Sequence, residues 1–419
     1  MNAMSEEKDK VEEKDAAVTE TAEDETKNQD AELEALNDEF FREMDIQGAD
    51  ISEGDRHLSE EKKKKLSDRK KVSKKKKKIR PFHVLVAILC LILALAVIGV
   101  GILLFLRSQG ESMLRQGEIK EDITAPDGVQ IEEDGKYVIY NGEKYCYNEH
   151  IINILCMGID TSIQGTEEGV IGENGQADAI ILAVIDTQTG QLHLVNISRD
   201  SMVDVNRYNV EGKYLGTEKM QLCLAYSYGD GEDDSCLNTA RSVSRLMYGM
   251  PIHAWAAIDY SGISVLNDEV GGVTVEVLED LSSKDPALVA GRTVTLTGQQ
   301  AHTYVRTRDT SLLESNNQRM ARQKQYMTAF LKTFFSKTKS DLTLPLKLYQ
   351  NAAGYMVTDI GPQETVYLSS LVLQKGFTEG NMDSVPGQIV QGEVYAEFIP
   401  DDKALYELIL KVFYTKVDE

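Results

Sequence analysis

The sequence is poor in the residues that build metal clusters and disulfide scaffolds. Its 419 residues include five Cys, six His and one Trp. No two cysteines have C-x-x-C spacing, and no Cys and His gather at the spacing of a zinc site, which argues against metal–thiolate chemistry. Eight Pro and 31 Gly are too few for a collagen-like or mucin-like chain, and 42% apolar residues argue against a wholly disordered one. Most of the chain therefore folds, as one large domain with appendages or as two domains.

Positive charge is scarce except in one segment. Residues 1–60 hold 21 acidic and 6 basic residues, residues 61–80 hold 2 acidic and 13 basic ones, and residues 81–106 hold no Asp, Glu, Lys or Arg. The remaining 45 acidic and 26 basic residues give 107–419 a net charge of −19. Because nucleic-acid binding needs a positive surface, this balance argues against a nucleic-acid-binding protein. Any anion site has to be local.

The uncharged run from Val84 to Leu106 predicts a single transmembrane helix. Its 23 residues would span about 34 Å, enough for a hydrocarbon core of ~30 Å. The run begins after 80 residues and has no small-residue cleavage site, so we interpret it as an anchor and not as a signal peptide. Lysines crowd the sequence just before it, which predicts a cell-membrane protein with residues 1–80 in the cytoplasm and 107–419 outside. The lysines then contact anionic lipid head groups, and a nuclear or nucleic-acid role is the alternative.

The composition divides the chain into four parts. We expect a disordered tail, acidic and then polybasic, over 1–80, the membrane span over 84–106, a stalk over 107–147 and one folded domain over 148–419. Strands in the folded domain are predicted at Ile151–Met157, Ala179–Ile185, Gln191–Ile197, Ala256–Asp259 and Val273–Val277. Helices are predicted at Ser235–Tyr248, Ser261–Val270, Thr297–Tyr304, Gln318–Phe335, Pro362–Leu373 and Asp401–Lys416. This alternation predicts an α/β fold, namely a layered α/β/α domain with a mixed central sheet.

Four cysteines lie in the part predicted to be outside the cell, where disulfides persist. Cys146, Cys156, Cys223 and Cys236 allow three pairings. Of these we expect Cys223 to pair with Cys236, and the other pairings stay open.

Two carboxylates mark strand ends in the predicted sheet. Asp160 follows the strand at Ile151–Met157 closely, and Asp178 directly precedes the next one. Open α/β sheets place their ligands at strand ends. A pair of Asp side chains is also what Mg²⁺ requires when phosphate oxygens and water complete its shell. Ordinary turn residues are the alternative interpretation of these two.

Arginines from three segments could meet at the same place. Arg199 and Asp200 end the third strand, and Arg306 and Arg308 point the same way if Val305–Arg308 is extended. Arg319 and Gln323 lie four residues apart on a predicted helix and share a face. Arginine forks match phosphate oxygens, and a pyrophosphate offers several of them. For each arginine alone, a surface salt bridge is the alternative.

The motifs together resemble the LytR-CpsA-Psr family. They are Asn153–Asp160 (NILCMGID), Asp178–Asp186, His193–Asp200 (HLVNISRD), Leu224–Gly229 (LAYSYG), Ile252–Val277, Leu296–Arg308 (LTGQQAHTYVRTR) and Arg319–Gln323 (RMARQ). Members of that family are bacterial membrane-anchored enzymes of cell-wall assembly with one N-terminal membrane helix. The resemblance covers about residues 150–335 clearly and 340–419 loosely.

The resemblance implies a phosphotransferase that moves a glycopolymer, such as teichoic acid or capsular polysaccharide, from a polyprenyl pyrophosphate carrier to peptidoglycan. Asp160 and Asp178 would then be the carboxylates associated with Mg²⁺, or with Mn²⁺. The pyrophosphate-binding set would be Arg199, Arg306, Arg308, Arg319 and Gln323. Asp200 would orient Arg199 or help the acceptor lose its proton. The implied partners are the lipid-linked polymer, peptidoglycan and the membrane, with no nucleic acid.

The sequence departs from the family pattern at three places. Gln176 and Ala177 replace an Arg-Ser before Asp178, Ser198 replaces a Pro before Arg199, and Met220–Leu222 replaces Lys-Ile-Asn. The missing arginine could remove one phosphate contact. Two other functions therefore stay open. One is a polyprenyl pyrophosphate hydrolase that uses water as acceptor, and the other is a non-catalytic surface scaffold or sensor that holds a lipid-linked glycan.

Overall fold

The computed structural model describes residues 105, 108–161, 170–172, 174–308, 315–375, 378–392 and 395–417. The predicted tail over 1–80 and the predicted span over 84–106, apart from Phe105, lie outside the described residues. Within the described ranges no helix combines the length and the apolar character needed to cross a bilayer. The membrane span therefore stays a prediction.

A six-stranded sheet forms the centre of the folded part, in the order β12-β9-β4-β5-β6-β13. The bounds of its strands are β4 Ile151–Ile159, β5 Ala177–Asp186, β6 Leu192–Ile197, β9 Ala254–Asp259, β12 Met356–Thr358 and β13 Met382–Ser384. β4 runs parallel to β9 and antiparallel to β5, and β13 runs parallel to β6. The sheet is thus mixed, as predicted. Near-continuous apolar runs in β4 and β5 suit strands that are buried on both faces.

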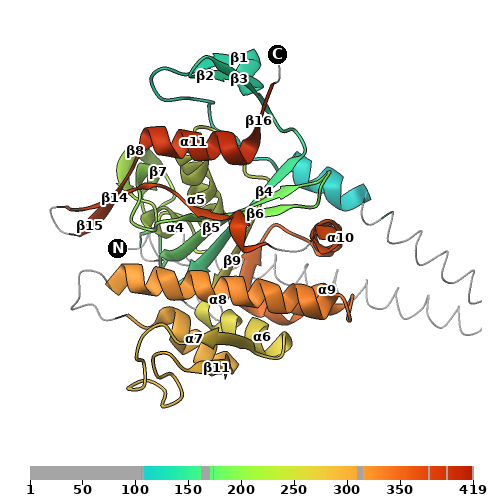
Figure 1. Ribbon diagram of the computed structural model, residues 1–419. Coiled ribbons are helices and arrows are strands. Elements are labelled where there is room, and N and C mark those ends of the chain that lie inside the picture. Colours follow the sequence, from blue (N-terminus) through green and yellow to red (C-terminus); the bar gives the residue numbers. More distant parts are fainter. Residues whose placement is uncertain are drawn as a thin grey trace, which may run out of the picture. The chain divides into compact units, whose positions relative to one another are not determined.

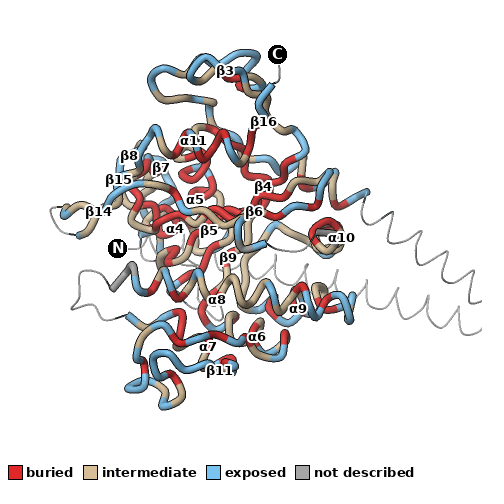
Figure 2. Tube along the Cα trace, in the orientation of Figure 1, coloured by how far each residue is buried: buried red, intermediate tan, exposed pale blue. Residues whose placement is uncertain are grey.

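Helices cover both faces of this sheet (Figure 1). On one face, α5 (Asp233–Leu246) and α11 (Asp402–Phe413) pack against Leu155 and Met157 of β4. On the other, α8 (Ser315–Thr338) and α10 (Pro362–Lys375) pack against Ile152 and Ile154. The alternation of neighbouring β4 residues between two cores follows from the two-residue period of a strand. Figure 2 shows the resulting buried residues along the central strands and on the inner sides of the helices. The predicted α/β/α layering is confirmed.

A further helical layer lies beyond α8. It holds α6 (Tyr260–Glu269), α7 (Gly298–Arg306), α9 (Leu344–Ala352) and the hairpin of β10 (Val273–Glu276) and β11 (Thr293–Leu296). These elements share their own apolar cluster, to which α8 contributes Tyr326. Thr297 caps α7, since its hydroxyl accepts the Gln300 amide hydrogen and the Gln300 side chain accepts that of Thr297. α8 therefore connects the sheet to the layer that carries α7.

Smaller elements complete the fold. The short helices are α4 (Leu224–Ser227), η1 (Glu133–Gly135), η2 (Ala353–Tyr355) and η3 (Glu379–Asn381). Two hairpins consist of β7 (Met202–Tyr208) with β8 (Tyr214–Gln221), and of β14 (Gly387–Gln391) with β15 (Ala396–Pro400). A helical segment also covers residues 108–116. The β7–β8 hairpin was not among the predicted elements.

The last strand of the described residues pairs with a meander within residues 130–147. β1 (Gln130–Glu132), β2 (Tyr137–Tyr140) and β3 (Glu143–Tyr147) form a meander in the segment interpreted as a stalk. β16 (Tyr414–Lys416) pairs with β3, so the predicted helix over Asp401–Lys416 was wrong in its last residues. Tyr414 turns extended and packs its ring on Tyr147 at 5.5 Å between centroids. This tertiary contact decides the conformation of the final turn.

The expected disulfide between Cys223 and Cys236 does not form. Both residues are buried and carry free thiols. Cys146 and Cys156 also carry free thiols and are half-buried. Cys236 lies on α5 in the main core, whereas the sulfur of Cys223 accepts a hydrogen bond from Nη2 of Arg199 at 3.1 Å. The two thiols therefore lie in different surroundings. The 12 residues between them gave no sign of this difference.

Candidate active site

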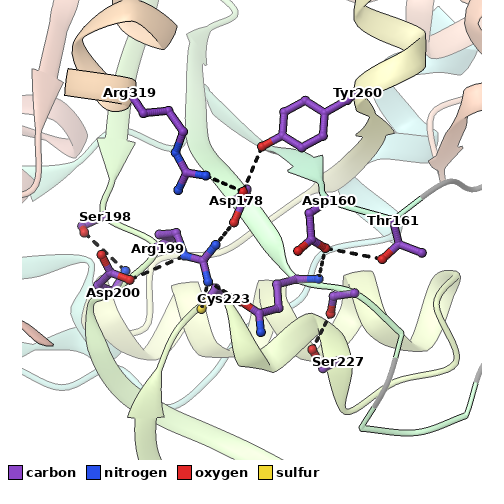
Figure 3. A network of polar contacts seen from close by, with 12 residues as sticks. Asp160, Thr161, Asp178, Ser198, Arg199, Asp200, Cys223, Ser227, Tyr260 and Arg319 are labelled. Atoms are coloured by element: carbon purple, nitrogen blue, oxygen red, sulfur yellow. Dashed lines mark hydrogen bonds and ion pairs between the residues drawn. The ribbon is translucent and has the colours of Figure 1, made fainter. Parts of the chain in front are cut away.

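Three neighbouring strands deliver the acidic residues of the site to one edge of the sheet. Ile159 of β4 is paired with Ala177 of β5 and with Asp259 of β9. Asp160 and Asp178 follow the first two of these residues, and Tyr260 follows the third. The register therefore explains why these three side chains share one place, which Figure 3 shows at close range.

Asp178 is the centre of the polar network. Its carboxylate forms an ion pair with Nη1 of Arg199, and its Oδ2 atom lies 2.6 Å from Nη1 of Arg319 and 2.9 Å from the Tyr260 hydroxyl. The side chains are 8% exposed for Asp178, 13% for Arg199 and 4% for Arg319. One buried and one half-buried guanidinium group thus converge on one buried carboxylate.

Asp160 lies next to this centre and is held by the backbone. Its Oδ1 accepts the Gln176 amide hydrogen at 2.6 Å and the Thr161 hydroxyl at 3.4 Å, and its own amide donates to the Gln176 carbonyl at 3.1 Å. Its negative charge acts on both Tyr260 and Arg319. Asp160 and Asp178 therefore belong to one electrostatic environment, as their positions in the sequence predicted.

Arg199 is fixed from several sides. Its Nη2 donates to Oε1 of Gln176 and to Cys223, and its Nε lies 3.5 Å from Oδ1 of Asp200. The Arg199 carbonyl accepts the Cys223 amide hydrogen at 2.9 Å. Asp200 in turn holds β15, because its carbonyl accepts the Phe398 amide hydrogen at 2.8 Å. The structure therefore places Asp200 beside Arg199, in the position from which it could orient that side chain.

Arg306 and Arg308 reach the site from the end of α7. The guanidinium of Arg306 lies over the Tyr260 ring, 5.4 Å from its centroid. Burial lowers the pKa of Arg308, and the positive charges of Arg319 and Arg199 lower it further. The expectation that Val305–Arg308 is extended was wrong for Val305 and Arg306, which belong to the helix. The two arginines enter the same environment because the chain turns extended at Thr307, between them.

Gln323 contacts the protein backbone. Its Nε2 donates to the Val305 carbonyl at 3.3 Å, so the amide holds the end of α7. Arg319, one turn earlier on the same helix, faces Asp178. Of this predicted pair, Arg319 thus faces the site, whereas Gln323 contacts the end of α7.

Positive charges crowd the site, and the pKa shifts reflect this. Burial lowers the pKa of Arg319, while the nearby Tyr260, Asp200 and Asp160 act against that shift. Burial raises the pKa of the Tyr260 phenol, and Arg319, Arg199 and Arg306 act against this. Because several cations share a partly desolvated volume, an added polyanion would gain more here than at a solvated surface.

Sequence reasoning missed three residues of the network, namely Tyr260, Gln176 and Cys223. Tyr260 opens the helix after a strand that is parallel to β4, so its position at the same sheet edge follows once that pairing is known.

Gln176 stands at the first departure from the family pattern, in place of an arginine, and its neutral side chain still accepts a hydrogen bond from Arg199. Ser198, at the second departure, accepts the Asp200 amide hydrogen at 3.3 Å. At the third departure, the Leu222 amide donates to the Ser201 carbonyl at 2.9 Å, close to Arg199 in the chain.

The donor set at the sheet edge fits a magnesium ion that substrate oxygens complete. Mg²⁺ in such sites is held by one or two carboxylates together with phosphate oxygens and waters. Asp160 and Asp178 would supply the carboxylates, and in the part of the chain described here no group of three or more His, Cys, Asp or Glu residues could hold a metal alone. Because Arg199, Arg319 and Tyr260 contact Asp178, a cation there would compete with those donors.

Comparison with known proteins identifies the family of the chain. A sequence model of the LytR_cpsA_psr family matches residues 118–409. The chain belongs to this family. The match includes every residue of the polar network and also the whole β1–β3 meander.

Two related sequences carry names that describe an activity. The polyisoprenyl-teichoic acid–peptidoglycan teichoic acid transferase TagV of Bacillus subtilis is 26% identical over 239 residues, which cover 56% of this chain and 55% of that protein. The transferase TagU of Enterococcus faecalis, named in the same way, is 26% identical over 161 residues, which cover 38% of this chain and 46% of that protein. The matched regions thus span about half the length of these relatives.

A solved structure supports the fold. The crystal structure of the Streptococcus agalactiae protein gbs0355 is 20% identical, covers 62% of this chain and 86% of its own, and superimposes with a TM-score of 0.50. At this identity the likeness concerns the fold alone, a mixed α/β domain.

Proposed function

We propose that this protein is a membrane-anchored phosphotransferase that attaches a glycopolymer of the teichoic acid or capsular type to peptidoglycan. The donor is a polyprenyl pyrophosphate carrier. One observation supports the proposal above the others, namely that Arg199 and Arg319 converge on Asp178 with Arg306 and Arg308 beside them. Membership of the LytR-CpsA-Psr family and the names of TagV and TagU agree with it.

The charge of the site suits a diphosphate. The region 107–419 carries a net charge of −19, and yet four arginines share this one environment. Guanidinium forks pair with phosphate oxygens in a bidentate manner. A pyrophosphate offers oxygens on two phosphorus atoms, and it would take over the position at which the Asp178 carboxylate now neutralises Arg199 and Arg319. Asp178 therefore acts as the internal anion of the ligand-free site.

The transfer step needs positioning and charge neutralisation more than covalent help. A sugar hydroxyl of peptidoglycan attacks the phosphorus on the polymer side, a new O–P bond forms, and the bridging P–O bond breaks. Polyprenyl phosphate leaves, and Asp200 accepts the proton of the attacking hydroxyl. Arg199, Arg306, Arg308 and Arg319 stabilise the charge that develops on the phosphate oxygens. Gln323 supports the end of α7, on which Arg306 lies.

Mg²⁺, or Mn²⁺ in its place, would be held by Asp160 and Asp178. A divalent ion supplies Lewis-acid neutralisation of phosphate charge. The span over 84–106 would anchor the chain in the cell membrane with 107–419 outside, where the lipid carrier and peptidoglycan are within reach.

The test is polymer attachment in a defined mixture. Full-length protein in detergent receives a lipid-linked glycopolymer and purified peptidoglycan, and covalently bound polymer is measured. We expect Arg306→Ala and Arg308→Ala each to lower attachment by about 10²–10³-fold. Arg241→Ala is the control, because Arg241 is an exposed arginine of α5 whose ion pair is with Glu121 at 3.6 Å. Polymer released into water without attachment would indicate the hydrolase, and wild-type attachment by both variants would indicate the scaffold.

A further inference from the structure

Arg322 is a cation that the proposed chemistry does not use. It lies on α8 one turn beyond Arg319, and only 2% of its side chain is exposed. It is among the largest fully buried side chains of the described residues. Burial of a guanidinium is costly unless its donors are satisfied, so its partners reveal what it does.

Arg322 holds the end of α7. Its Nη1 donates to the Tyr304 carbonyl and its Nη2 donates to the Thr307 carbonyl. Its Nε lies 2.5 Å from Oε1 of Glu279, and its guanidinium lies 5.8 Å from the centroid of the Tyr304 ring. One planar fork therefore joins α8, the terminus of α7 and the segment that follows β10.

The Tyr304 carbonyl belongs to the last turn of α7 and the Thr307 carbonyl to the residue that caps it, where carbonyls lack partners within the helix. The last carbonyls of an α-helix have no amide donor within it, and the helix dipole favours a positive charge at that end. Gln323 donates to Val305, so two neighbouring side chains of α8 hold the carbonyls of Tyr304, Val305 and Thr307. Arg306 and Arg308 alternate with the last two of these residues.

We infer that Arg322 is a positioning residue, which fixes Arg306 and Arg308 relative to Arg199 and Arg319 by clamping the end of α7 to α8. The inference rests on the proposed function. Arg319 and Arg322 belong to the same helix, so α8 holds Asp178 with one arginine and the α7 terminus with the other. The spacing between the two halves of the phosphate site is then set by one turn of a rigid helix.

The clamp needs the fork of an arginine. A lysine keeps the charge opposite Glu279 but cannot donate to two carbonyls from one plane. Arg322→Lys therefore removes the paired hydrogen bonds to the two carbonyls and keeps the positive charge opposite Glu279. Arg245→Lys is the matched control, because Arg245 also combines an ion pair, with Glu121 at 3.0 Å, and a backbone contact, with the Asp204 carbonyl at 3.3 Å.

The first measurement follows the clamp without any ligand. Hydrogen exchange is measured on the full-length protein in detergent, for the amides of residues 303–308. Their exchange should be about fivefold or more faster in Arg322→Lys than in the wild type and unchanged in Arg245→Lys. Unchanged exchange in Arg322→Lys would overturn the inference.

The second measurement tests positioning, with inorganic pyrophosphate as the probe in isothermal titration. Arg322→Lys should weaken binding about tenfold in the wild-type background, and less than about twofold when Arg308→Ala is already present. Equal losses in both backgrounds would assign Arg322 a general structural role and overturn the inference. Wild-type affinity in Arg322→Lys despite faster exchange would also overturn it, and would leave the proposed function intact. Absence of pyrophosphate binding by the wild type would overturn the proposed function itself and the positioning role with it, even where exchange confirms the clamp.

Discussion

Asp178→Asn is the substitution that separates the two roles of the central carboxylate. In the ligand-free protein Asp178 neutralises Arg199 and Arg319, and in the proposed enzyme it also helps to hold Mg²⁺. The amide keeps the shape of the side chain and can still accept from Tyr260, but it carries no charge. The buried Arg319 and the half-buried Arg199 then lose their shared counter-charge.

The expected loss of stability follows from the burial. Removing one partner of a buried ion pair costs about 3–5 kcal/mol, and we take the lower end because Arg199 keeps Asp200 at 3.5 Å. At about 2 °C per kcal/mol for a domain of this size, the unfolding midpoint should fall by roughly 6 °C. Pyrophosphate without Mg²⁺ should restore much of this, since a ligand at 100 times its Kd stabilises by about 2.7 kcal/mol. In the wild type the same concentration of pyrophosphate should raise the unfolding midpoint by less, because the Asp178 carboxylate already pairs with Arg199 and Arg319.

The assay is thermal unfolding of the full-length protein with and without pyrophosphate, in the presence of a chelator. Asp383→Asn is the control, since Asp383 also bridges two basic groups, His193 at 2.9 Å and Lys411 at 2.6 Å. That variant should show the wild-type response to pyrophosphate. An equal rise of the midpoint in the wild type and in Asp178→Asn would refute the idea that Asp178 occupies the phosphate position.

Three further outcomes are expected. Tyr260→Phe should lower the free energy of unfolding by about 1–2 kcal/mol in urea titration, because it removes the bond to Asp178 and keeps the ring beneath Arg306; a loss above about 4 kcal/mol would contradict this. Asp178→Asn should lower polymer attachment more at low than at high Mg²⁺, and an equal loss at all concentrations would argue against metal binding there. His253, whose Nδ1 accepts the Asn153 amide hydrogen at 3.1 Å, has its pKa lowered by burial to about 4, so protons bind the unfolded chain more readily and stability falls as the pH drops from about 6.5 to 4. The loss should be about 2 kcal/mol between about pH 7.5 and 5, and unfolding of His253→Gln should lack this part of the dependence.

The elements were largely predictable because their signals are local. The apolar runs of β4, β5 and β6 fix strands that are buried on both faces, and the capping box at Thr297 fixes the start of α7. Boundaries failed where a distant partner decides the conformation. Tyr414 leaves the last helix because β3 offers it a strand partner.

The sequence predicted which residues are candidates for the site, but it did not predict which of them contact one another. Asp160 and Asp178 could be placed at strand ends, since Asp160 follows one apolar run and Asp178 precedes the next. No local signal showed that Arg319 reaches Asp178 across 141 residues, or that Cys223 contacts Arg199 and stays reduced. Tyr260 joined the network only through the parallel pairing of β4 with β9.

The sequence alone determined the predicted anchor, the charge of each segment, the secondary structure of the core and the family motifs, because each depends on residues close together in the chain. Only the tertiary structure decided which arginines share Asp178 and which one, Arg322, turns from the phosphate site to hold α7. The physical reason is that identical guanidinium groups take different roles according to the acceptors that packing brings to them.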